Sequence, residues 1–323
     1  MNQQASEATI CVTPRERFSC AVDSLKDIAR NTERPYQLVY IDANTPAHVA
    51  TDLAAICAEH GFDYLRINEY LAPNQARNIA LGRSSTRYVA FVDNDLFVQP
   101  GWLNALLRCA EDTGAWAVSP VVLEGGAALQ IVHMAGGDLI EEPVGGYNRL
   151  QQKHRYMKLP LRSVRKKLTR EAVGFFEFHC ALVRTDVFSS RAFLDEGFLS
   201  HQEHIDLARE IRLSGGSVFF EPESVVRYDT ARSFQPYDRE FFELRWSDDW
   251  SDRSIEHARR KWQLAPDDAG LARLAYWTGI HRNLFNETQS RTPWIVKAVP
   301  RAARRMAATW LREHKLLKPR QLP

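Results

Sequence analysis

The chain has 323 residues, of which 45% are hydrophobic and 25% are charged, and its formal net charge is +2. These values are typical of a soluble globular enzyme with one large core or two moderate ones, and they give no reason to expect a nucleic acid partner. The five cysteines lack the paired spacing of zinc sites and disulfide frameworks. The start has no signal-peptide pattern and no window approaches a membrane span, so we expect a cytoplasmic protein.

Short apolar runs alternate with helical patterns in the first third of the chain. We predict strands at 8–13, 37–42, 62–67 and 87–93, and helices at 16–29, 46–59 and 74–81. This alternation is typical of a parallel sheet covered by helices, which binds ligands beyond the carboxyl ends of its strands. The polar residues at 13–15, 42–44 and 93–95 are therefore expected to meet at one site.

The pattern is less regular farther along. We predict helices at 101–115 and 201–216, strands at 116–123, 129–140 and 174–184, and two short strands within 217–229. Residues 147–170 are rich in Lys and Arg, and we interpret them as a mobile loop or short helix, either a solvated surface or a lid that meets phosphate groups. Beyond Pro236 the pattern is almost wholly helical. We expect a domain at 1–235, with halves at 8–120 and 121–235, and a helical extension at 236–323.

Asp93 and Asp95 follow a buried strand and are separated only by Asn94. Two carboxylates this close repel each other unless positive charge lies between them. The spacing suits a hard divalent cation that bridges a diphosphate, with one carboxylate on the cation and the other on its water or on the ligand. The simpler interpretation is that Asp and Asn end the strand because they favour turns.

Four segments, taken in order, carry a resemblance to a known family. They are ATICVTPRERFSCAVDSL, LVYIDAN, NQARNIALGRSSTRYVAFVDNDLFVQPGWLNAL and LDEGFLSHQEHIDLAREIRLSGG. Over residues 8–229 the chain resembles the nucleotide-sugar transferases of glycosyltransferase family 2. The resemblance implies the α/β GT-A fold, with a mostly parallel central sheet flanked by helices, to which this chain adds its helical C-terminal extension.

The resemblance also implies roles for individual residues. Pro14 and Arg15 match the loop that cups the nucleotide base, and Asp42 matches the acid that accepts a hydrogen bond from uracil. Asp95 matches the acid that ligates Mn²⁺ or Mg²⁺, and Asp93 the acid that faces the ribose or the metal. The implied donor-binding residues are Pro14, Arg15, Asp42, Asn74, Arg77, Asn78 and Asp93.

The chain departs from the family pattern at Glu203-His204, where relatives commonly carry Glu-Asp and the aspartate takes the proton of the acceptor hydroxyl. Either Glu203 or His204 is the expected base in an inverting displacement. The alternatives are that Glu203 caps a helix and that His204 packs beneath the acceptor.

Relatives often place a metal-binding histidine after the strand at 217–229, where this chain has Tyr228 and Asp229. Asp229 is either a third metal ligand or a turn residue. By analogy His179 lies under the acceptor or donor sugar, although a lone histidine on a strand is more often structural.

A helix over 294–312 would place Ile295, Val299 and Trp310 on one face and Lys297 and Arg301 on another. Such a basic amphipathic helix either lies on an anionic membrane surface or packs onto the protein.

Taken together, these features predict a metal-dependent inverting glycosyltransferase with a nucleotide-sugar donor. The family resemblance alone implies that the nucleotide is UDP. The expected acceptor is a glycan or a lipid-linked glycan of a bacterial surface polysaccharide. Two alternatives stay open: a non-catalytic sugar-nucleotide or glycan-binding relative, and a phosphatase of the haloacid dehalogenase kind, which also uses Asp-x-Asp after a strand.

Overall fold

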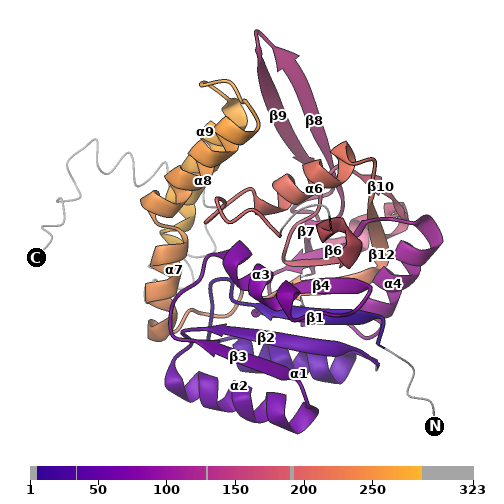
Figure 1. The fold of residues 1–323 in the computed structure, drawn as a ribbon, viewed down its shortest axis with the longest axis vertical. Helices are drawn as coiled ribbons and strands as arrows, with labels where there is room; N and C mark the ends of the chain where they lie inside the picture. Colours follow the sequence, from indigo (N-terminus) through magenta and orange to yellow (C-terminus); the bar gives the residue numbers. More distant parts are fainter. Residues whose placement is uncertain (1–5, 34, 129, 190–192, 286–323) are drawn as a thin grey trace, which may run out of the picture. The chain divides into compact units, whose positions relative to one another are not determined.

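The computed structural model describes residues 6–33, 35–128, 130–189 and 193–285. Within these ranges the chain forms one ten-stranded sheet, a separate two-stranded hairpin and surrounding helices (Figure 1). The predicted α/β fold, with a central sheet flanked by helices, is confirmed. The helix predicted over 294–312 lies outside the described residues.

The first half of the sheet is parallel, as predicted. Its strands are β1 (Ala8–Thr13), β2 (Gln37–Ala43), β3 (Asp63–Ile67) and β4 (Tyr88–Asp93), in the spatial order β4-β1-β2-β3. Every residue of β1 and β4 is buried, because both strands are central and covered on both faces. The helices between them are α1 (Ala21–Asn31), α2 (Ala47–His60) and α3 (Pro73–Gly82).

The second half of the sheet adds antiparallel strands, so the complete sheet is mixed. Strand β11 (Cys180–Arg184) pairs antiparallel with β4 and with β6 (Ala117–Glu124), and β12 (Val218–Tyr228) pairs parallel with β6. The remaining elements of this half are β5 (Leu96–Val98), α4 (Trp102–Thr113), β7 (Ile131–Met134), β10 (Glu171–Val173), η2 (Thr185–Phe188) and α6 (Glu203–Leu213).

Several local expectations differ from the structure. The strand predicted at 129–140 is divided into β7 and a second strand that begins at Gly137, and the one predicted at 174–184 is a strand only from Cys180. The strand β5 follows Asp95 directly, because residues 96–98 pair with β12 and α4 begins only after Gly101, whose φ is 81°. Residues 217–229 form one long strand with an irregularity between Glu221 and Val225, rather than two short strands. Helix α1 begins at Ala21 instead of residue 16, because Asp238 accepts hydrogen bonds from the amides of Phe18 and Ser19.

The basic region 147–170 is only partly the loop or short helix that we predicted. Its first residues form β9 (Tyr147–His154), which pairs with β8 (Gly137–Val144) through a two-residue turn at Gly145-Gly146. Both glycines have positive φ, 61° and 83°, which is what this kind of tight hairpin turn requires. The rest contains the short helices α5 (Leu161–Val164) and η1 (Arg165–Lys167).

The helices after Pro236 belong to the same compact unit as the sheet, which extends through Phe285. They are η3 (Pro236–Asp238), α7 (Arg239–Arg245), α8 (Asp248–Lys261) and α9 (Ala269–His281). The main hydrophobic core continues from the sheet into α8 and α9 through Ile255, Trp262 and Leu271. The predicted boundary at 235 therefore separates elements that share one core.

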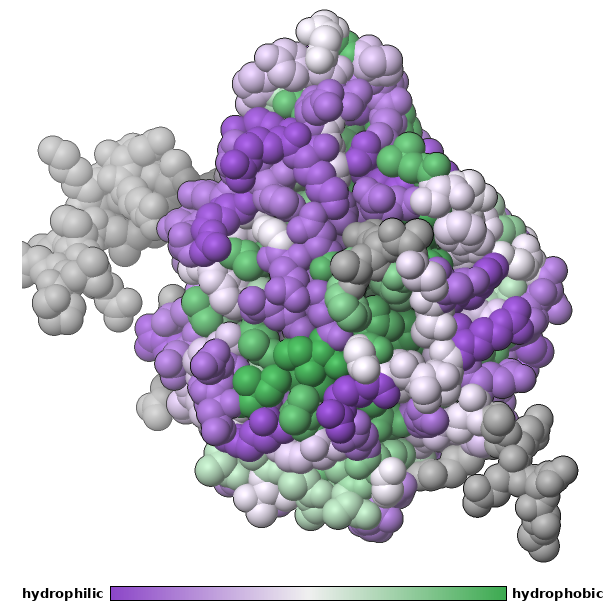
Figure 2. Space-filling model, viewed as in Figure 1, coloured by the Kyte–Doolittle hydropathy of each residue, from purple (hydrophilic) through white to green (hydrophobic). Residues whose placement is uncertain are grey.

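The surface of the described part is mostly hydrophilic in the view of Figure 2, with hydrophobic residues gathered in one area of that face. Among the described residues, the helices are all too short or too polar to cross a membrane.

Candidate functional site

The turn after β4 is tied to the end of β1. The side-chain oxygen of Asn94 accepts a hydrogen bond from the amide of Arg15 at 3.0 Å, and the amide of Asn94 donates to the carbonyl of Thr13 at 2.9 Å. Asn94 therefore fixes the backbone between the two carboxylates. Both Asp93 and Asp95 are almost completely buried, with 0% and 1% exposure.

Asp93 is surrounded by positively charged and basic groups. Its Oδ2 lies 3.4 Å from Nε of Arg15 and 3.1 Å from Nδ1 of His179, and its Oδ1 lies 3.4 Å from Nη2 of Arg77. Burial would raise the pKa of Asp93, but Arg15, His179 and Arg77 outweigh it and lower the pKa below its usual value. Asp93 is therefore ionised and already balanced by protein cations.

Asp95 has the opposite environment. Neither of its carboxylate oxygens has a hydrogen-bond partner among the described residues, and both are buried. Burial first, and then the nearby charges of Asp93 and Glu16, raise its pKa well above the usual value. A buried carboxylate without a donor is costly, and a hard cation is the ligand that satisfies it best. The residues present therefore fit a divalent cation at Asp95.

The loop after β1 brings more buried charge to the same place. Glu16 accepts hydrogen bonds from Nε1 of Trp246 at 2.8 Å and from the hydroxyl of Tyr228, and it lies 3.2 Å from Nε2 of His281. Trp246 and His281 come from the helical extension, so that part of the chain helps to build the site. Nothing in the local sequence pattern marks Glu16 for this role.

Asp42 lies at the end of β2, where sequence reasoning places the nucleotide base. Its carboxylate accepts hydrogen bonds from the amide of Thr45 at 2.8 Å, from Nη1 of Arg66 at 2.5 Å and from the hydroxyl of Tyr64. Asp42 is thus fully engaged within the protein, and a base would have to compete with Arg66 or Tyr64 for it.

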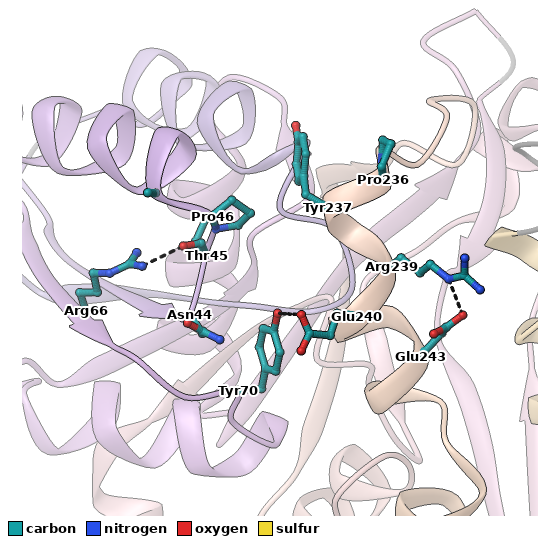
Figure 3. A pocket seen from close by; sticks show the side chains of 11 residues that line it. Asn44, Thr45, Pro46, Arg66, Tyr70, Pro236, Tyr237, Arg239, Glu240 and Glu243 are labelled. Carbon is teal, nitrogen blue, oxygen red and sulfur yellow. Dashed lines mark hydrogen bonds and ion pairs between the residues drawn. The ribbon is translucent and has the colours of Figure 1, made fainter.

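A cavity of 540 Å³ opens beside Asp42 (Figure 3). One wall comes from the end of β2 and from β3, including Asn44, Thr45 and Arg66. The other wall comes from η3 and α7. Tyr70, from the loop between β3 and α3, donates a hydrogen bond to Glu240 of α7 across the opening. None of Asp42, Asp93 and Asp95 lines this cavity, but Thr45 and Arg66, which do, both contact Asp42.

Two of the other predicted donor-binding residues, Asn74 and Asn78, have structural partners. The side-chain amide of Asn74 donates to the carbonyl of Asp195 at 2.8 Å, and Asn78 exchanges hydrogen bonds with Leu194 and Glu196. Both asparagines therefore anchor the segment 194–196, and their contact with a donor stays a prediction. Pro14 is buried at the start of the loop after β1.

Glu203 begins α6 and is held between two buried arginines. Its Oε1 lies 3.6 Å from Nη1 of Arg77 and 3.4 Å from Nη2 of Arg245. Burial opposes its ionisation, but Arg245 and Arg77 outweigh this effect and lower its pKa to about 2. Such a carboxylate is a poor proton acceptor near neutral pH. Gln202, which precedes it, has a φ of 70°, a strained conformation for a residue other than glycine.

His204 is the next residue and is partly buried. Burial lowers its pKa to about 4, so its imidazole is neutral near pH 7 but is a weaker base than an ordinary histidine. Of the two residues left open by the sequence, His204 still has the higher pKa and is the stronger base.

Asp229 is engaged away from the carboxylate pair. Its Oδ2 lies 2.9 Å from Nη1 of Arg227 and 3.4 Å from Nε of Arg232, and its Oδ1 accepts a hydrogen bond from the amide of Ala231. Tyr228 points to Glu16 and Arg17 instead. These partners favour the turn interpretation of Asp229, and its role as a metal ligand stays a prediction.

Replacing Glu203 by glutamine should lower the free energy of unfolding at pH 7 by about 3–5 kcal/mol, because Arg77 and Arg245 would stay buried without their counter-charge. Since the pKa of Glu203 is lowered from 4.5 to about 2 on folding, its contribution is fully present above pH 4.5 and is lost as the pH falls towards 2. Urea denaturation at several pH values measures both effects. The control Glu243→Gln, which breaks the exposed pair with Arg239, should cost less than about 1 kcal/mol. Equal stability of Glu203→Gln and the wild type at pH 7 would show that the ion pairs of Glu203 with Arg77 and Arg245 do not stabilise the fold.

Comparison with known proteins supplies independent evidence. The sequence profile described as Glycosyl transferase family 2 matches residues 10–191, more than half of the chain. A search of curated proteins found no match.

Solved structures share the fold at low sequence identity. One is the crystal structure of GalNAc-T7 with UDP, GalNAc and Mn²⁺, with a TM-score of 0.55 and 17% identity over 91% of this chain. Another is residues 1–349 of TarS from S. aureus in complex with UDP-GlcNAc, with a TM-score of 0.53 and 10% identity over 92% of this chain. The chain spans 58% of the GalNAc-T7 chain and 77% of the TarS chain. The phosphatase alternative is thereby excluded, and the chain belongs to glycosyl transferase family 2.

Proposed function

We propose that this protein is a metal-dependent glycosyltransferase that moves a sugar from a UDP-linked donor to a glycan or lipid-linked acceptor, with inversion at the sugar carbon. The observation that carries the proposal is the buried carboxylate of Asp95 at the carboxyl end of a central strand, which has no hydrogen-bond donor in the part of the chain that the structure describes. The family match and the UDP-containing structures of similar fold support the class of donor.

Asp95 would hold the divalent cation, Mn²⁺ or Mg²⁺, with Asp93 beside it. When bound, such a cation neutralises negative charge on the leaving diphosphate. Arg15 is placed to assist, because its side chain is 17% exposed and its Nε lies beside Asp93 without a hydrogen bond. The cavity beside Asp42 would receive the base.

His204 would accept the proton of the acceptor hydroxyl. The hydroxyl oxygen forms the new bond to the sugar carbon while the bond from that carbon to the diphosphate oxygen breaks, and the proton passes to an imidazole nitrogen. Glu203 would be a positioning residue, because its ion pairs with Arg77 and Arg245 hold the start of α6 in place. The non-catalytic alternative predicts the same donor binding without release of UDP.

The acceptor would belong to bacterial surface polysaccharide synthesis in the cytoplasm, at the inner face of the membrane. The class of acceptor is suggested by the family resemblance alone, and the contact with the membrane by the basic and apolar pattern of residues 294–312.

The variant Asp95→Asn should lose metal-dependent donor binding and keep its fold. In the wild type, UDP with Mn²⁺ should raise the melting temperature well above the effect of UDP alone, because a ligand of the folded state stabilises it. The variant should show no such difference, and without ligands it should melt no earlier than the wild type, because an unpaired buried carboxylate has been removed. The control Asp229→Asn should respond to Mn²⁺ as the wild type does. If Asp229→Asn lost the effect of Mn²⁺ on the melting temperature and Asp95→Asn kept it, the metal ligand would be Asp229 and not Asp95.

The variant His204→Asn should lower the rate of UDP release from a responsive UDP-sugar by about 10²–10⁴-fold, because the base is removed. Its affinity for UDP with Mn²⁺, measured by calorimetry, should stay at the wild-type value. Turnover by His204→Asn at the wild-type rate would exclude this histidine as the base.

Full-length protein should float with vesicles that contain anionic lipid, and a chain that ends before Trp294 should not. Equal flotation of the two proteins would remove the membrane contact from the proposal.

A further inference from the structure

Three side chains with metal-binding atoms meet beside Asp93. His133 lies on β7, and Glu177 and His179 lie two residues apart just before β11. One ligand atom from each lies within 4.8 Å of the others. The Oε2 atom of Glu177 is 3.0 Å from Nε2 of His133 and 3.8 Å from Nε2 of His179. Ligands of a tetrahedral zinc ion are about 3.3 Å apart, so these separations need little adjustment.

The atoms of this cluster that face one another are Nε2 of His133, Oε2 of Glu177 and Nε2 of His179. Oε2 of Glu177 is buried, and its contacts with the two histidine nitrogens are charge contacts rather than well-formed hydrogen bonds. His179 is 3% exposed. A metal ion between these three atoms would replace the contacts that they now make with one another.

The outer atoms of the same side chains are held by neighbours. Nδ1 of His133 is 2.9 Å from Oε2 of Glu124, and Oε1 of Glu177 is 2.9 Å from Nε2 of His154. Nδ1 of His179 lies 3.1 Å from Oδ2 of Asp93. A carboxylate behind a histidine ring is the usual second contact of metal-binding histidines, because it orients the ring and makes its other nitrogen a better ligand.

The cluster also attracts positive charge. The carboxylates of Glu124 and Glu177 lie 2.9 Å and 3.0 Å from the two ring nitrogens of His133. A metal ion with two positive charges would bind where this negative charge is concentrated, through a histidine nitrogen that carries no proton.

We propose that His133, Glu177 and His179 bind a zinc-class transition metal ion, at a site separate from the cation at Asp95. Two imidazoles and one carboxylate are a ligand set of zinc sites that keep a fourth position open, whereas Mg²⁺ prefers oxygen ligands throughout. This inference goes beyond the proposed glycosyl transfer and does not depend on it.

Binding of Co²⁺ tests this site, because Co²⁺ replaces Zn²⁺ and absorbs visible light strongly when its ligands are tetrahedral. The full-length protein is stripped with EDTA, dialysed and titrated with Co²⁺. We expect one equivalent to develop the tetrahedral spectrum and one equivalent of Zn²⁺ to remove it. His133→Gln and Glu177→Gln should each weaken Co²⁺ binding at least tenfold, with circular dichroism confirming that both variants are folded.

Two control variants separate this site from others. Asp95→Asn should keep the spectrum, because its carboxylate belongs to the other cation, and so should His48→Gln, which removes an exposed histidine. Absence of the tetrahedral spectrum in the wild type would overturn the proposal. Its loss in Asp95→Asn, or its persistence in a folded His133→Gln or Glu177→Gln variant, would do the same. None of these results depends on whether the protein transfers sugar.

Discussion

The site depends on how buried negative charge is balanced at the carboxyl end of β4. A carboxylate that leaves water costs several kcal/mol unless hydrogen bonds or opposite charge replace its hydration. Arg15 and Arg77 provide the opposite charge for Asp93, and Arg77 and Arg245 provide it for Glu203. The buried carboxylate of Asp95 has no hydrogen-bond partner among the described residues, and the proposed cation is assigned to it for that reason.

The helices after Pro236 are part of this balance. Arg245 forms the second ion pair of Glu203. Trp246 and His281 contact Glu16, whose negative charge raises the pKa of Asp95. Asp238 fixes the loop after β1 that carries Arg15. A truncation at residue 235 would therefore remove groups that balance the charge of the site.

Local patterns in the sequence were enough for the parallel half of the sheet and for the position of Asp93 and Asp95 after a buried central strand, because buried strands and helix periodicity are local properties. They were not enough for β5 or β9, whose pairing partners lie far along the chain. The sequence also could not predict that the pKa of Asp93 is lowered and that of Asp95 is raised, because these shifts depend on Arg77, His179 and Glu16 from separate segments. The sequence could not distinguish Glu203 from His204 as the base, because the ion pair of Glu203 with Arg245 forms only in the folded chain. The cluster of His133 and Glu177 carries no recognisable spacing, since β7 and the residues before β11 meet only in the folded chain.

The central claim is that a cation at Asp95 holds the donor's diphosphate at the end of β4. The most direct measurement is the anomalous scattering of Mn²⁺ in a crystal of the full-length protein grown with UDP and Mn²⁺. The account predicts an anomalous peak within bonding distance of an Asp95 oxygen and of the diphosphate. A peak elsewhere with UDP bound, or UDP bound far from β4, would contradict it.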